Sequence, residues 1–88
     1  MTDEEVVGLL RTALREAMPE RASEIESLDL NLELRDLGIS SVVAMEIIGY
    51  VEDALARTFR REELAGVRRL SDIALLIQDR ADVSGRRT

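Results

Sequence analysis

The sequence predicts an all-α fold, a small bundle of three main helices plus one short helix. Apolar residues recur at helical spacing in three separate segments, which is the pattern of amphipathic helices. The chain has 88 residues, which is the length of a single domain. Aromatic residues make up only 2% of it, so aliphatic side chains must supply nearly all the burial, and regular aliphatic packing suits small helical bundles.

The first predicted helix begins after Thr2 and ends before Pro19. Thr2 can cap the helix, and Glu5, three residues later, completes a capping box. Pro19 disfavours the helical conformation at Met18, which therefore lies beyond the last turn. The apolar residues at helical spacing form one face: Val6, Leu9, Leu10, Ala13, Leu14 and Ala17.

A long connection spans residues 20–36, and four leucines alternate within it: Leu28, Leu30, Leu32 and Leu34. Alternation alone is typical of a strand. We reject the strand because no second segment alternates in the same way, and a lone strand leaves its backbone groups unpaired. We expect a loop with a short helical turn that lays these leucines over the bundle.

The second helix is predicted from Ser41 to about Arg57, with Ser40 as its cap. Gly49 in its middle costs about 1 kcal/mol relative to alanine, so we expect a neighbour or a partner to approach closely there. Spacing predicts one inward side for this helix and so places Met45 in the core. The residues of that side, to which Ile47 lies close, are Val42, Met45, Ile48, Val51, Glu52 and Leu55. Five residues are predicted to point outward: Val43, Glu46, Gly49, Tyr50 and Asp53.

The last third of the chain predicts a brief helical turn from Glu62 to Ala65, closed by Gly66, and then a final helix. Ser71 is expected to cap this helix, which runs to about Ala81. Its inward residues are predicted to be Ile73, Ala74, Leu76 and Ile77. We therefore expect one domain over residues 1–80 and a flexible C-terminal tail over residues 81–88.

Composition excludes most catalytic chemistry. The chain has no cysteine and no histidine, so it lacks a thiol nucleophile, the commonest general base and the commonest metal ligand. The net charge of −6 argues against nucleic acid as a partner. The acidic start lacks the features of a signal peptide, and no apolar segment has the length of a membrane span, so we expect a cytoplasmic protein.

One motif is more specific than the composition. The stretch "DLGISS", Asp36 to Ser41, opens an apolar helix that carries Glu46, Glu52 and Asp53. With "NLELRDLG" before the serine and "RLSDIALLI" in the last helix, it resembles the acyl and peptidyl carrier proteins over roughly residues 4–78. The resemblance implies an acyl-carrier-protein-like fold and a non-catalytic carrier. It identifies Ser41 as the attachment point of a 4′-phosphopantetheine arm taken from coenzyme A, whose thiol holds acyl or aminoacyl groups as thioesters.

The resemblance also implies partners. These are a phosphopantetheinyl transferase, an acyl- or aminoacyl-loading enzyme, and synthase or modifying enzymes. We expect the carrier itself to be a monomer. Exposed acids on the second helix could meet basic residues on such enzymes, although an ordinary solvated helix face would look the same. The partner-binding residues that we predict are Val42, Val43, Glu46, Glu52 and Asp53.

Two departures from the family pattern bear on the pathway. Ser40 stands where many members have an aspartate, and Val43 stands where fatty-acid carriers usually have an acid. Both favour polyketide or nonribosomal peptide biosynthesis over fatty-acid synthesis. Two alternatives stay open: a fatty-acid-type carrier, and a helical protein-interaction module of the same fold that is never modified.

Overall fold

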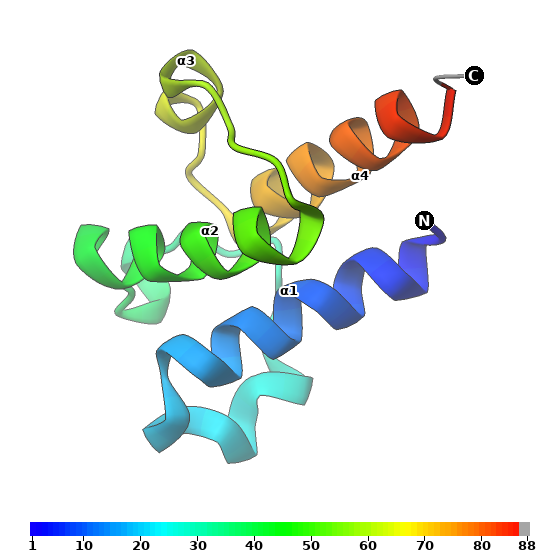
Figure 1. The fold of residues 1–88 in the computed structure, drawn as a ribbon. Coiled ribbons are helices and arrows are strands. Elements are labelled where there is room, and N and C mark those ends of the chain that lie inside the picture. The colour runs from blue at the N-terminus through cyan, green and yellow to red at the C-terminus, as the bar shows by residue number, and fades with distance from the viewer. Residues whose placement is uncertain (87–88) are drawn as a thin grey trace.

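The chain folds into an all-α bundle, as the sequence predicts (Figure 1). The computed structural model describes the backbone of residues 1–86 and the side chains of residues 1–80. No strand occurs within this described part, and none of its helices is long and apolar enough to cross a membrane. The α-helices are α1 (Asp3–Ala17), α2 (Ser41–Leu55), α3 (Arg61–Ala65) and α4 (Leu70–Arg86), and the 3-10 helices are η1 (Pro19–Ser27) and η2 (Arg35–Leu37).

Helix α1 is the centre of the packing, because it contacts α2, η1 and α4. In Figure 1, α1 starts and α4 ends on the same side of the molecule, and α3 lies on the side of α2 away from α1. The core between these helices is aliphatic except for Met18 and Phe59. Its fully buried larger side chains are Leu10, Leu14, Ile25, Ile47, Val51, Leu70, Ile73 and Ile77.

Local signals at the ends of α1 act as the sequence predicts. The Thr2 hydroxyl accepts a hydrogen bond from the Glu5 N–H at 3.1 Å, and the Thr2 N–H donates to the Glu5 carboxylate at 2.7 Å. This pair is the predicted capping box. Before Pro19, Met18 takes a non-helical conformation and ends the helix. On the predicted apolar face, four residues are buried and Leu9 and Ala17 are half-buried.

The connection between α1 and α2 is irregular, so rejecting a strand was right. It contains η1, a loop and η2, and its one bridge of β type is an isolated pairing of Glu33 with Arg69. The Leu34 N–H donates to the Arg68 carbonyl at 2.8 Å, which attaches the loop to the segment before α4. Three of the alternating leucines pack against the core, whereas Leu32 is 42% exposed.

The inward side predicted for α2 is wrong at Val42 and Met45. Met45 is 56% exposed and Val42 is 72% exposed, so neither lies in the core. Residues in an α-helix advance by about 100° each, so a row at intervals of three rotates by roughly 60° per step. Val42 therefore points to roughly the opposite side from Val51. The buried residues of α2 are Ile47, Ile48 and Val51.

Two further details of α2 differ from the prediction. The helix ends at Leu55, where Ala56 takes a left-handed conformation with φ of 54°, and does not reach Arg57. At Gly49, an added Cβ would meet no atom within 4 Å. The predicted close approach by a neighbour in the same chain is therefore wrong, and an approach by a partner stays a prediction.

In the C-terminal third, the starts of both helices also differ from the prediction. Helix α3 begins at Arg61, one residue early, and Gly66 closes it as predicted. Ser71 does not cap α4: the helix begins at Leu70, and the Asp72 carboxylate accepts from the N–H groups of Arg68 and Arg69, both at 2.9 Å.

Helix α4 continues to Arg86, beyond the predicted end at Ala81. Ile73 and Ile77 are buried as expected, with Ala74 and Leu76 half-buried. Residues 87 and 88 of the predicted tail lie outside the described residues. The division of the chain after residue 80 stays a prediction.

Candidate functional site

Ser41 is the first residue of α2, and its side chain is exposed. Among the described residues, its hydroxyl has no hydrogen-bond partner. The N–H groups at the start of an α-helix have no acceptor within the helix, and the helix dipole places partial positive charge there. No acidic side chain occupies the first turn of α2. The position therefore suits a serine ester of phosphate, whose negative charge it would stabilise.

The neighbouring serine has a different task. The Ser40 hydroxyl accepts a hydrogen bond from the Val43 N–H at 3.2 Å, which makes Ser40 the cap of α2, as predicted. A hydroxyl that caps the helix is fixed toward the backbone. Of the two adjacent serines, Ser41 is thus the one whose hydroxyl is available to a second protein.

The turn before the serines depends on Gly38. Its φ is +71°, in the left-handed region that residues with a Cβ adopt at a cost, and it caps η2. Ile39 follows and is 5% exposed, so it anchors the segment in the core. Gly38 therefore allows the sharp turn that leads into α2.

A cleft of about 360 Å³ opens beside Ser41. Most of its wall is apolar, and it is built from α2, from the segment around η2 and from the stretch between α3 and α4. Its lining residues are Glu33, Leu34, Arg35, Ile39, Ser41, Ala44, Met45, Ile48, Leu64, Val67 and Arg68. Exposed Met45 thus lies at the cleft rather than in the core, and sequence spacing missed this role.

Two carboxylates stabilise the segment from α3 to the start of α4, which supplies one wall of this cleft. The N–H groups of Arg68 and Arg69 hold the pKa of Asp72 below its ordinary value by stabilising the ionised form. The N–H group of Arg60 is the main cause of the lowered pKa of Glu63, and the Arg80 guanidinium adds to it. Arg80 also lies 6.0 Å from the centre of the Phe59 ring, so the turn that carries α3 is attached to α4.

Of the predicted partner-binding residues, the exposed ones share one face of α2 by helical spacing, and the other two are half-buried. Val42 and Glu46 are exposed near Ser41, and Val43 is half-buried. Glu52 is half-buried, and its carboxylate accepts a hydrogen bond from the Phe59 N–H at 2.8 Å. Its observed contact therefore holds the chain that follows α2. Asp53 is exposed near the C-terminal end of α2, away from Ser41.

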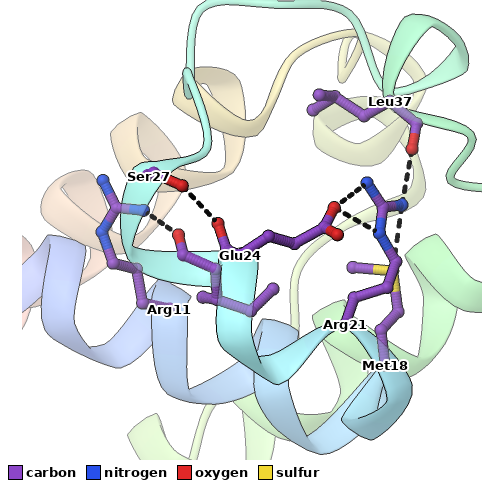
Figure 2. A network of polar contacts seen from close by, with 7 residues as sticks. Arg11, Met18, Arg21, Glu24, Ser27 and Leu37 are labelled. Atoms are coloured by element: carbon purple, nitrogen blue, oxygen red, sulfur yellow. Dashed lines mark hydrogen bonds and ion pairs between the residues drawn. The ribbon is translucent and has the colours of Figure 1, made fainter.

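A guanidinium that sequence reasoning missed attaches η1 to the segment before Ser41. Figure 2 shows Arg21 between Glu24 and the backbone carbonyl of Leu37. Arg21 Nη1 donates to the Leu37 oxygen at 2.6 Å, and Nε donates to Glu24 Oε1 at 2.8 Å. Leu37 is 16 residues away along the chain, so no local pattern indicates this contact.

Comparison with known proteins agrees with this geometry. A family model described as "Phosphopantetheine attachment site" matches residues 8–77, which include α2, the cleft and both serines. Searches of curated proteins and of solved structures give no significant match.

Proposed function

Because the chain belongs to the phosphopantetheine attachment site family of carrier proteins, we propose that Ser41 is the residue that receives the arm. Carriers of this family are not catalysts. They bear a covalent 4′-phosphopantetheine, which a phosphopantetheinyl transferase supplies, and they then serve pathway enzymes. Which residue of this chain accepts the arm, and which pathway it serves, are our proposals.

One observation carries the choice of Ser41: its hydroxyl is exposed and bonds to no residue that the structure describes, whereas the hydroxyl of Ser40 caps α2. The site also fits a phosphodiester, because the start of α2 offers backbone N–H groups and no acidic side chain. The cleft beside Ser41 gives room for part of the arm or its cargo.

The protein's own residues present the Ser41 hydroxyl and hold the start of α2, and they do not catalyse the transfer. Ser41 Oγ is the nucleophile that attacks the phosphorus next to pantetheine in coenzyme A. The P–O bond of the pyrophosphate breaks, adenosine 3′,5′-bisphosphate leaves, and the transferase supplies the magnesium and the base that takes the serine proton. Ser40 and Gly38 fix the start of the helix on which that hydroxyl is presented. The arm, once attached, supplies the thiol that this chain lacks.

We further propose that the surface beside Ser41 is a docking site for pathway enzymes with an apolar centre. Val42 and Met45 are large, exposed and close along α2, and Glu46 adds a negative charge beside them. Isolated exposed apolar residues are common, but here two adjoin the reactive serine. Glu46 and the net charge of −6 favour a partner with a basic rim around its apolar contact.

The same surface supports a role in polyketide or nonribosomal peptide biosynthesis. Val43, two residues after Ser41, is half-buried against the core and so leaves no acid at that place on the surface. A fatty-acid-type carrier is the second candidate, favoured by the apolar cleft, which suits an acyl chain. An unmodified interaction module, favoured by Ser40 in the aspartate position, is the third.

The test is a transfer reaction in solution. The apo protein is incubated with coenzyme A, Mg²⁺ and a transferase of broad specificity, and the intact mass is measured. We expect the wild-type protein and Ser40→Ala to gain one phosphopantetheinyl group, and Ser41→Ala to gain none. Absence of the gain in the wild type would favour the unmodified module, and a gain in Ser41→Ala would place the arm elsewhere.

A further inference from the structure

The Arg21 side chain links three parts of the chain. It is 25% exposed, and it starts from η1. Nη1 donates to the Leu37 oxygen at 2.6 Å and lies 3.9 Å from the Met18 sulfur at the end of α1, and Nε donates to Glu24 Oε1 at 2.8 Å (Figure 2). One planar group thus contacts α1, η1 and the end of η2 at once.

The bond to Leu37 is placed where the path of the chain is decided. Leu37 is the last residue of η2, and carbonyls at the end of a helical turn lack partners within that turn. Gly38, with its φ of +71°, follows directly, and only Ile39 and Ser40 then separate it from Ser41. A rotation of the Leu37 peptide would therefore change the direction in which the chain enters α2.

Two attachments hold η2 at its two ends. The Leu34 N–H donates to the Arg68 carbonyl at 2.8 Å, which fixes the start of η2 to the segment before α4. Arg21 fixes its end to η1. Within the turn, the Gly38 N–H donates to the Arg35 carbonyl at 3.2 Å, and the Ile39 N–H donates to the Leu34 carbonyl at 2.9 Å. Arg21 adds to these bonds the contact that joins the Leu37 carbonyl to η1.

We propose that Arg21 is a positioning residue for Ser41. It acts through the Leu37 carbonyl, holding the turn at Gly38 so that the Ser41 hydroxyl is presented to the transferase in one geometry. This inference rests on the proposed function of Ser41. Arginine suits the task because its planar fork donates to a carboxylate and a carbonyl together, whereas a lysine ammonium has no such fixed geometry.

The competing explanation is that Arg21 only stabilises the fold, and Arg15 provides the matched control. Arg15 reaches from α1 to Glu26 in η1 at 2.6 Å, so it also ties down η1 through a carboxylate. Its contact with Glu26 does not involve the segment before Ser41. Glu24→Gln is a second control, because it weakens the ion pair of Arg21 and leaves the bond to Leu37 in place.

The experiment compares Arg21→Met, Arg15→Met, Arg21→Lys and Glu24→Gln with the wild type, each as the whole chain in the apo form. Thermal unfolding measures the stability of each variant. Steady-state transfer of phosphopantetheine from coenzyme A gives kcat and KM for the carrier. Amide ¹H–¹⁵N spectra of the apo proteins report the backbone at residues 38–41 without any transferase.

For Arg21→Met we expect kcat to fall about tenfold, because small misplacements of a reacting group are costly, while KM for the carrier stays unchanged, since the exposed face of α2 is intact. Amide shifts should appear at residues 38–41. Arg15→Met and Glu24→Gln should stay within about twofold of the wild-type rate. Arg21→Lys should lie between Arg21→Met and the wild type in both measurements.

Two results would overturn the inference: wild-type kcat and amide shifts in Arg21→Met, or an equal loss of kcat in Arg15→Met. If Arg21→Met does not fold, Arg21→Lys tests the inference. An Arg21→Lys variant with the kcat and the amide shifts of the wild type would overturn the inference. A wild-type protein that gains no arm would refute the proposed function instead. The amide shifts would then still test whether Arg21 holds the turn.

Discussion

Replacing Ser40 by alanine separates the two serines by their physical roles. The Ser40 hydroxyl satisfies the Val43 N–H at 3.2 Å, one of the N–H groups that have no acceptor within α2. Loss of such a cap costs between about 0.5 and 2 kcal/mol. The bond is exposed, so water replaces part of it, and we expect a loss of about 1 kcal/mol.

For a domain of this size, 1 kcal/mol corresponds to a fall of about 4–8 °C in the melting temperature. Ser41→Ala is the control, because that hydroxyl is exposed and bonds to no described residue, and it should change stability by less than about 0.5 kcal/mol. Thermal unfolding followed by circular dichroism measures both. A stable Ser40→Ala beside a destabilised Ser41→Ala would refute the assignment of cap and free hydroxyl.

Three further outcomes are expected. Gly49→Ala should raise stability by about 0.5–1 kcal/mol in chemical denaturation, because an added Cβ meets no atom within 4 Å; a loss of stability would contradict this. Val42→Asp should leave the melting temperature nearly unchanged, because Val42 is 72% exposed, yet slow loading by a pathway enzyme, and equal loading would remove Val42 from the docking surface. The pKa of Asp72 is lowered from 3.8, so the stabilisation from its bonds is fully present above that unfolded value and is lost as the pH falls through the lower folded pKa. The melting temperature should therefore fall as the pH drops from about 5 to 3, less steeply in Asp72→Ala, and equal slopes would contradict the role of Asp72.

The features that the sequence predicts correctly depend on contacts between near neighbours. Thr2 with Glu5, Met18 before Pro19, and Ser40 with Val43 each act within four residues, so the type of residue nearly determines the conformation. The wrong predictions arise where the rotation of successive residues around a helix adds up over several turns. Rows at intervals of three rotate around α2, so Val42 and Met45 leave the side that buries Val51.

The cap of α4 is also local, but Ser71 and Asp72 are both suited to it, so residue type alone does not decide between them; Asp72 accepts from the N–H groups of Arg68 and Arg69. Other features depend on how distant segments meet. Arg21 finds its acceptor 16 residues later, a pairing that only the packed fold creates. The site was therefore predictable at its serines, and its cleft and supporting contacts were not.

The central claim, that Ser41 carries the arm, is tested most directly by locating the group on the chain. Cleavage after arginine releases residues 36–57 as one peptide that contains both serines. Tandem mass spectrometry of this peptide from the loaded protein, with a fragmentation method that keeps phosphate esters intact, separates the two positions. We expect every fragment that includes Ser41 to carry the added mass, and fragments ending at Ser40 to lack it. A group on Ser40, or an unmodified peptide from a protein whose mass has increased, would contradict the account.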